Sequence, residues 1–460
     1  MKRKSILLAI LTLLLVGIVI GLNLLIPTGA AYSAKILCSS VFVADREAEA
    51  VIAKDLGFYS FIWMDVDEVK KQTHASFLGM WKRTAVYREG LGCSLAIGVE
   101  ADELQARQPE MLSARPAAYD SLLFPMGDRL MVADSFRAQI DFEQLQQGID
   151  QAFVEPDPAN PTVNTRAVVV VYDSILVGEK YAEGFDKNTP LLGWSMTKSV
   201  TQTMLGILIE RGHLALDDSL PFDAWAGEND PRGEISIDQM LRMSSGLAFQ
   251  EVYLPPADAT TMLFESHSAS DYALEKGVAY PPDSVWSYSS ATSNILSRLV
   301  RQTVGEKNYL NFPRQTIFDP LGMRSAVIEP DASGTFVGSS FMYATGRDWA
   351  RYGMLYLNDG LWNGQRILPE GWVDYTRTPT PKSNGIYGAH FWLNAGLNEM
   401  GDERRFPDAP QDVFFPSGFE GQYVFIIPSK RLVVVRLGFT PGRGDFDINA
   451  FLREIVKAVK

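Results

Sequence analysis

The most informative pattern in this chain is GWSMTKSV, residues 193–200. Apolar residues follow it at helical spacing, and Gly212 then supplies a helix stop signal. We therefore predict a helix over residues 195–211. Ser195 would stand at its start, with Lys198 one turn further along on the same face.

A serine and a lysine at this spacing suggest nucleophilic catalysis. The Ser195 alcohol is a poor nucleophile until a base removes its proton, and the Lys198 amine can do this only when desolvation or a nearby cation keeps it neutral. A helix amino terminus also favours developing negative charge. By itself the motif is weak, because on the order of one Ser-x-x-Lys is expected by chance. The alternative is that Ser195 caps the helix and Lys198 is solvated.

A second motif, Tyr288-Ser289-Ser290, follows a Pro-Pro turn, and Asn294 comes soon after in a helix-like stretch. A tyrosine beside a serine–lysine pair can carry a proton to a leaving group. The alternative is an ordinary half-buried aromatic residue.

A third motif is PSGFEGQ, residues 416–422, which leads into a predicted hairpin near the carboxyl end. Glycines beside an edge strand let its backbone approach a ligand, and an N–H group there could complete an oxyanion hole. The alternative is a simple β-turn.

Strand patterns occur at both ends of the region that holds these motifs. One predicted hairpin joins Arg166–Tyr172 to Ile175–Tyr181, and the other joins Tyr423–Ile427 to Leu432–Leu437. Helical segments such as Asp348–Asn358 lie between them. We predict an α+β fold in which both ends of the catalytic domain build one antiparallel sheet, with a helical subdomain beside it.

The amino terminus differs from the rest of the chain. Lys2-Arg3-Lys4 precedes an uncharged apolar run from Ile6 to Ile26, about 21 residues, which is enough to cross a bilayer core of about 30 Å. We favour an uncleaved transmembrane anchor over a cleaved signal, whose cleavage site would lie near Thr28–Ala30. The cationic start argues against a buried soluble helix. By the positive-inside rule, the rest of the chain is expected outside the cytoplasm, on the periplasmic side.

Composition narrows the function classes. Of 460 residues, 46% are hydrophobic and 21% charged, which is typical of a globular protein, and the net charge of −13 lacks the basic footprint of a nucleic-acid binder. The four histidines and two cysteines show no metal-ligand spacing, so we expect no metal or other cofactor. We predict an anchor or signal over 1–34, an accessory segment over 35–135 and a catalytic domain over 136–460. The oligomeric state stays open.

The two cysteines, Cys38 and Cys93, both lie in the expected exported region, where oxidation is permitted. We predict a disulfide between them. Two buried thiols are the alternative.

Together, the three motifs resemble those of the serine β-lactamase/penicillin-binding-protein superfamily. Flanking segments are similar to its class C-like branch, and within that branch to 6-aminohexanoate-dimer hydrolase and related esterases: LRMSSGL (241–247), DPLGM (319–323) and YATGRDW (343–349). The resemblance covers roughly residues 140–460 and is more specific for the superfamily than for the substrate.

The resemblance implies a role for each motif residue. Ser195 would be the acylated nucleophile, Lys198 its general base and Tyr288 the proton shuttle. The backbone N–H groups of Ser195 and Phe419 would form the oxyanion hole. The substrate-binding residues would be Tyr253, Ser290, Asn294 and Gly418.

Two departures from the family pattern bear on the substrate. Ser290 stands where β-lactamases usually have Asn, and Pro416 stands where they usually have Lys or His. Loss of that cation should weaken binding of carboxylate-bearing substrates by about 1.5–3 kcal/mol. We therefore expect a hydrolase of small amides or esters rather than a β-lactamase or D-Ala-D-Ala peptidase. A catalytically silent, membrane-tethered protein that binds cell-wall peptide or a partner is the alternative outside enzymology.

Overall fold

The computed structural model describes residues 2–111, 121–130, 138–397, 402–442 and 446–460. These residues form two compact units, neither of which is continuous in the sequence. The first unit comprises Met1–Pro109, Phe249–Tyr272 and Pro330–Thr335, and the second comprises Glu110–Ala248, Ala273–Glu329 and Phe336–Lys460. The first unit therefore includes two segments from within the range expected for the hydrolase domain.

The first unit is built on a long helix and a small sheet. In the described chain its four strands pair in the antiparallel order β1-β2-β3-β4. Its elements are α1 (Lys2–Phe42), α2 (Ala48–Lys54), η1 (Gly57–Tyr59), β1 (Trp63–Asp67), β2 (Gln72–Phe77), β3 (Met80–Arg88), β4 (Gly92–Leu95), α3 (Ala101–Ala106), α7 (Asp258–Phe264) and most of α8 (Ala269–Leu274).

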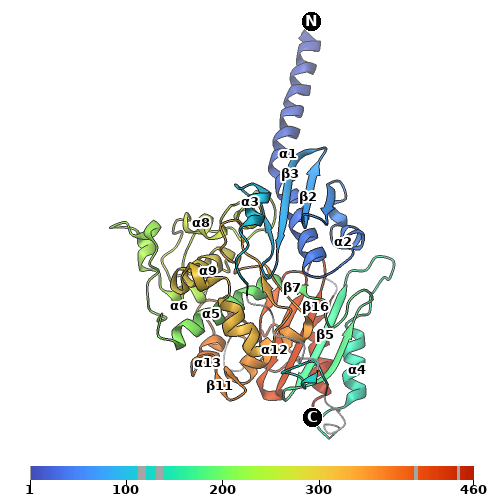
Figure 1. Cartoon of the computed structure of the whole chain (residues 1–460), viewed down its shortest axis with the longest axis vertical. Coiled ribbons are helices and arrows are strands. Elements are labelled where there is room, and N and C mark those ends of the chain that lie inside the picture. The colour runs from blue at the N-terminus through green and yellow to red at the C-terminus, as the bar shows by residue number, and fades with distance from the viewer. Residues whose placement is uncertain (1, 112–120, 131–137, 398–401, 443–445) are drawn as a thin grey trace. The chain divides into compact units, whose positions relative to one another are not determined.

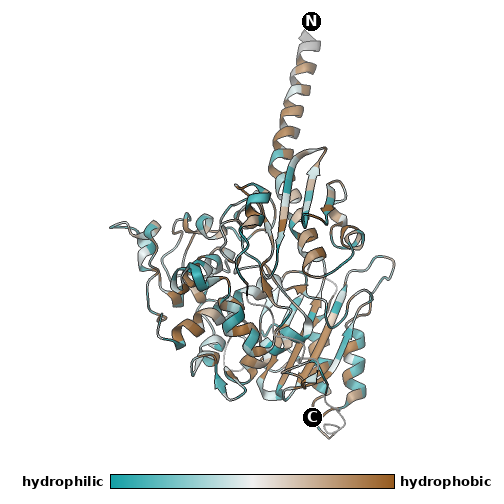
Figure 2. Cartoon of the chain, viewed as in Figure 1, coloured by the Kyte–Doolittle hydropathy of each residue, from teal (hydrophilic) through white to brown (hydrophobic). Residues whose placement is uncertain are grey.

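Helix α1 is much longer than the apolar run predicted from the sequence. It continues through Pro27 to Phe42. Its side chains change from exposed to buried at Ile26, where small residues such as Ala30 and Ala34 let it pack closely within the first unit. The exposed and apolar part of α1 stands out in Figures 1 and 2. By length and composition, this helix could cross a membrane.

Cys38 of α1 is disulfide-bonded to Cys93 of β4. The bond joins the buried half of α1 to the sheet of the first unit, and the described residues contain no free cysteine.

The second unit contains the antiparallel sheet expected from both ends of the hydrolase domain. Six of its strands follow the order β12-β13-β15-β16-β5-β6, and β14 pairs with β15, which makes seven strands in the described chain. The strands are β5 (Thr165–Tyr172), β6 (Ile175–Tyr181), β12 (Trp392–Leu393), β13 (Phe414–Phe415), β14 (Ser417–Gly418), β15 (Gln422–Ile427) and β16 (Leu432–Gly438). The predicted hairpins thus meet where β16 pairs with β5.

Helices and short strands surround this sheet. The helices are α4 (Phe142–Gln151), η4 (Trp194–Met196), α5 (Thr197–Glu210), η5 (Asp223–Trp225), η6 (Pro231–Glu234), α6 (Ile237–Leu241), α9 (Ser290–Val304), α10 (Glu306–Tyr309), the π-helical turn η7 (Arg314–Phe318), α11 (Asp319–Leu321), α12 (Gly346–Leu357), α13 (Trp372–Arg377), η8 (Pro428–Lys430) and α14 (Ile448–Lys457). The remaining strands are β7 (Leu191–Leu192), β8 (Val327–Ile328), β9 (Met342–Ala344), β10 (Leu361–Trp362) and β11 (Gln365–Arg366).

The sheet is covered on both faces. On one face, α4 and α14 pack their apolar sides on alternate residues of the central strands, such as Val170 and Val434. On the other face, α12 approaches so closely that a Cβ atom at Gly353 would stand 2.6 Å from Val433. The burial of this valine-rich pair of strands, β5 and β16, forms the main apolar core of the unit.

Candidate active site

Ser195 lies just before α5, in the single 3₁₀ turn η4, rather than in the α-helix predicted from the sequence. The preceding residue, Trp194, is buried with φ +47°. This left-handed conformation is costly for a bulky residue. Trp194 is fixed there by its indole N–H, which donates to Glu420 at 3.1 Å. The turn leaves Ser195 partly accessible while both its neighbours are buried.

Lys198 is buried, and its amine meets three oxygen atoms. Nζ lies 3.0 Å from Ser195 Oγ, 3.0 Å from Ser290 Oγ and 2.9 Å from the carbonyl oxygen of Ser339. The carbonyl can only accept a hydrogen bond. A neutral amine can therefore donate to Ser339 and Ser290 and keep its lone pair for the proton of Ser195.

Tyr288 lies beside this pair. Lys198 Nζ is 5.0 Å from the centre of its ring, and the ring packs on Trp392 at 5.2 Å between centroids. Tyr387 and Trp286 complete this aromatic group. The structure thus brings together the two motifs that carry Ser195, Lys198 and Tyr288.

The third motif also reaches the turn that carries Ser195. β14 passes so close to η4 that a Cβ atom at Gly418 would stand 2.1 Å from the carbonyl oxygen of Gly193. The next residue, Phe419, has its ring 5.8 Å from that of Trp194. Only glycine fits at 418, which explains how an edge strand can bring its backbone to the predicted nucleophile.

The residues predicted to bind substrate have different positions. Ser290 contacts Lys198 directly. Asn294 is buried one turn further along α9, where its side-chain oxygen accepts from the backbone N–H of Ser339 at 3.2 Å. The part of Asn294 in substrate binding stays a prediction.

Tyr253 belongs to the first unit, whereas Ser195 and Lys198 belong to the second. Its ring is exposed, and its hydroxyl donates to Glu251 at 2.6 Å. Its part in substrate binding stays a prediction.

Two structural contributors were missed by sequence reasoning. One is Ser339, whose carbonyl meets Lys198. The preceding Gly338 carbonyl accepts from Thr201 of α5 at 2.9 Å. The only available signal was the glycine, since a Cβ at 338 would stand 2.6 Å from the Thr201 hydroxyl.

The other is His390, which is fully buried behind the site. Its ring bonds to the carbonyl of Leu241 at 2.7 Å and to Ser293 Oγ at 2.8 Å, and its own carbonyl accepts from Ser199 Oγ at 2.7 Å. Burial lowers the pKa of His390 to about 3, against a smaller opposite effect of the bond to the Leu241 carbonyl. A neutral imidazole therefore joins α6 to α9, and the backbone carbonyl of the same residue joins them to α5.

The described residues contain no cluster of His, Cys, Asp or Glu that could hold a metal ion. The chemistry available at the site is that of a serine hydroxyl, an amine and a phenol.

A serine and a buried lysine at the start of a helix, next to the edge strand of an antiparallel sheet, define a class of serine hydrolase. The model of the beta-lactamase family matches residues 151–456. The chain is 24% identical over 308 residues to 6-aminohexanoate-dimer hydrolase from Paenarthrobacter ureafaciens, a match that covers 60% of this chain and 73% of that protein.

Solved structures share the fold. A family VIII carboxylesterase matches with a TM-score of 0.55 at 14% identity, covering 72% of this chain and 98% of that one. A penicillin-binding protein homologue from Caulobacter crescentus matches with a TM-score of 0.51 at 16% identity, covering 68% and 95%. The chain therefore belongs to the beta-lactamase family of serine hydrolases and is related to 6-aminohexanoate-dimer hydrolase.

Proposed function

We propose that this protein is a membrane-anchored hydrolase that cleaves a small linear amide or ester through an acyl-enzyme on Ser195. The observation that carries the proposal is the 3.0 Å contact between Lys198 Nζ and Ser195 Oγ, made by a buried amine at the start of α5. A serine within hydrogen-bond reach of a base that is itself oriented by other groups is the arrangement nucleophilic catalysis requires. Here Ser290 and Ser339 orient the base.

In the acylation step, unprotonated Lys198 takes the hydroxyl proton as Ser195 Oγ attacks the substrate carbonyl carbon. The carbonyl oxygen becomes an oxyanion, which the backbone N–H groups of Ser195 and Phe419 stabilise. Tyr288 passes a proton to the departing nitrogen or oxygen and recovers one from Lys198. The bond to the leaving group breaks, and the acyl group stays on Ser195.

In the deacylation step, water takes the place of the leaving group. Tyr288 and Lys198 remove its proton as it attacks the acyl carbon, and the Ser195 oxygen leaves with a proton returned from Lys198. The products are a carboxylic acid and free enzyme. No step needs a metal or organic cofactor.

Three features support a small linear substrate. Pro416 puts no cation at the start of β14, which disfavours a β-lactam carboxylate. Trp392 and Trp286 group with Tyr288, so the leaving group would meet an apolar wall. The related 6-aminohexanoate-dimer hydrolase makes a linear amide the first candidate.

We further propose that α1 is retained as an anchor and that both units lie outside the cytoplasm. A signal cleaved near Thr28–Ala30 would end within a buried part of α1, where Thr28 bonds to Glu265 of the same unit. Removal of Ile26 would also strip apolar packing from the first unit. Residues 136–460 remain the proposed hydrolase region, and 35–135 the proposed accessory segment.

A substrate panel tests this function. Full-length protein and S195A should be compared on linear amides, a short-chain nitrophenyl ester and a chromogenic cephalosporin. We expect Ser195-dependent turnover of the ester and of at least one amide, far faster than of the cephalosporin. The opposite ranking would make the protein a β-lactamase. Binding of cell-wall peptide with no turnover of any substrate would favour the silent binding protein.

A further inference from the structure

We propose that one end of the first unit's sheet is a lipid-contacting collar, which seats this unit in the interface of the bilayer that α1 crosses. We define the collar as Phe58, Tyr59, Phe61, Trp63, Phe77, Leu78, Met80 and Trp81. The inference rests on the proposal that α1 spans a membrane, and it goes beyond it, because an anchor helix alone requires no contact between the folded unit and lipid.

The collar is an unusual concentration of exposed apolar side chains. The most exposed members are Phe58 (84%), Leu78 (78%), Trp63 (56%), Phe61 (51%) and Met80 (51%). Leu78 and Gly79 form the tight turn between β2 and β3, both with positive φ. Such turns usually carry Asn, Asp or Gly in soluble proteins. An exposed cluster of this kind marks an interaction surface.

The pairing of the strands puts these side chains at the same end of the sheet. Trp63 at the start of β1 pairs with Ser76 near the end of β2, and Phe77 pairs with Met80 at the start of β3. The η1 turn immediately before β1 adds Phe58 and Tyr59.

The collar is attached to α1 at both of its ends. The indole N–H of Trp81 donates to the side-chain oxygen of Asn23 at 2.9 Å. Tyr59 packs on Tyr32 at 5.2 Å between rings and lies against Gly29, where an added Cβ would stand 3.3 Å away. Ring contacts of 6.2 to 6.3 Å then connect the members between these ends: Tyr59–Phe61, Phe61–Phe77 and Phe77–Trp81.

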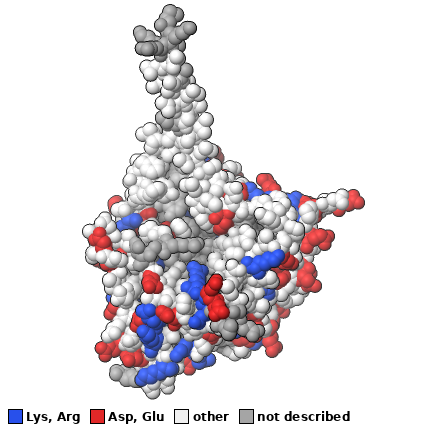
Figure 3. Space-filling model, turned by 180° about the vertical axis from the view of Figure 1, so that it is seen from behind, with Lys and Arg blue, Asp and Glu red and all other residues white. Residues whose placement is uncertain are grey.

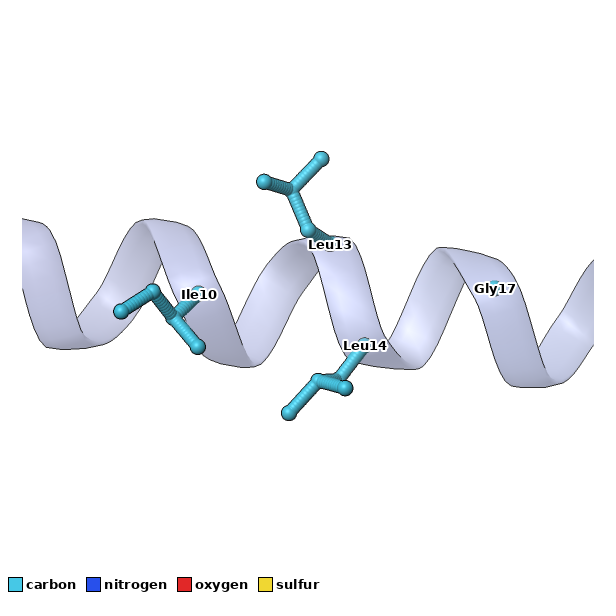
Figure 4. Close-up of a pocket in the computed structure, with 4 residues that line it drawn as sticks. All are labelled: Ile10, Leu13, Leu14 and Gly17. Atoms are coloured by element: carbon cyan, nitrogen blue, oxygen red, sulfur yellow. The ribbon is translucent and has the colours of Figure 1, made fainter.

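The attachment points lie where α1 changes from exposed to buried. The stretch of α1 that carries exposed large apolar side chains runs from Ile6 to Leu25, about 20 residues or about 30 Å, which is the thickness of a hydrocarbon core. Figure 4 shows Ile10, Leu13 and Leu14 projecting outward from this stretch, and Figure 3 shows no charged side chain along it on the face in view. The two residues of α1 that the collar contacts, Asn23 and Gly29, lie on either side of the end of this stretch. The collar would therefore lie at the depth of the membrane–water interface. Tryptophan and tyrosine prefer that depth.

The opposite end of the same sheet has a contrasting composition. The turn between β1 and β2 carries Asp67, Glu68, Lys70 and Lys71 around a single exposed apolar residue, Val69, at 95% exposure. This charged composition is typical of a surface that faces water. Helix α1 continues into the core of the unit, and Cys38 of α1 is bonded to Cys93 of the sheet. Insertion of the helix into the bilayer therefore sets the depth at which the collar lies.

Site-directed fluorescence tests the collar in the full chain. The described residues hold no free cysteine, so F58C, L78C and V69C each add one labelling site. Each variant is labelled with the polarity-sensitive dye NBD and inserted as one copy per phosphatidylcholine nanodisc. We expect blue-shifted emission at positions 58 and 78, with roughly half of the signal quenched by lipids that carry a shallow doxyl group, and no change at position 69.

Each other outcome would overturn the proposal. If NBD at positions 58 and 78 emits at the wavelength that it shows in water, the collar does not touch lipid. A blue shift without doxyl quenching means that protein covers it. Quenching at all three positions means that the unit adsorbs without orientation. Failure of the protein to co-purify with nanodiscs refutes the spanning helix, and ester turnover measured on the same samples reports the proposed hydrolase function separately.

Discussion

The backbone of Gly418 in β14 lies directly against the carbonyl oxygen of Gly193, two residues before Ser195. A Cβ atom at 418 would stand 2.1 Å from that oxygen, so G418A must push the edge strand away from the turn that carries the nucleophile. Because this strand would deliver the N–H group of Phe419 to the oxyanion, we expect kcat/KM for an ester to fall about 100-fold. Steady-state kinetics measures the loss.

Gly277 supplies the matched control, because an added Cβ there meets no atom within 4 Å. G277A should keep wild-type kinetics. Equal activity of G418A and G277A would remove β14 from the proposed site.

Tyr288→Phe tests the proton shuttle without removing the ring that packs on Trp392. We expect kcat to fall by about 10² or more, with KM little changed, since loss of a general acid–base group affects the chemical step. The control is Y375F, which removes a hydroxyl bonded to Asp238 and should keep kcat. A Y288F enzyme with wild-type kcat would exclude Tyr288 from proton transfer.

His390 should make stability depend on pH. Burial lowers its pKa to about 3 in the folded protein, against about 6.5 in an unfolded chain. Above pH 6.5 the two states bind the same number of protons at this group. Between pH 6.5 and 3 only the unfolded chain takes up the proton. The free energy of unfolding therefore decreases by about 1.4 kcal/mol for each unit by which the pH is lowered.

Urea unfolding of wild type and H390Q at pH 7.5 and 4.5 measures this dependence. The wild type should lose about 3 kcal/mol more than H390Q over that interval. H213Q, which removes an exposed imidazole of the same unit, should follow the wild type. Parallel pH dependences of wild type and H390Q would show that His390 titrates when folded as it does when unfolded.

The disulfide can be counted directly. Denatured, unreduced protein should react with no thiol reagent, and reduction should release the two thiols of Cys38 and Cys93. Its removal in C38A/C93A should lower the free energy of unfolding by about 2–5 kcal/mol, because the bond restrains the unfolded chain. Two reactive thiols before reduction would contradict the bond.

Features set by local pattern were predictable from the sequence. The valine-rich runs of β5 and β16 are continuous apolar segments bounded by turns, and the structure confirms both hairpins and their shared antiparallel sheet. The spacing of Ser195 and Lys198 likewise predicted that their side chains would lie on the same face one turn apart, and the two side chains are 3.0 Å apart.

Features set by tertiary packing were not predictable. Pro27 and Gly29 are typical of a helix end, yet α1 continues because burial within the first unit outweighs local propensity. The carbonyl of Ser339 reaches Lys198 across 141 residues, and a backbone acceptor leaves no signature in residue type. His390 gave no spacing signal because its partners come from three separate segments.

The central claim is that Ser195 is a nucleophile activated by Lys198, and covalent labelling tests it most directly. Wild type, S195A and K198A should be treated with a fluorophosphonate and analysed by intact-mass and peptide mass spectrometry. We predict one adduct per wild-type chain, mapped to Ser195, none on S195A, and labelling of K198A slowed by about 10² or more. Wild-type protein that gains no label beyond the S195A control, or an adduct mapped to another residue, would contradict the account.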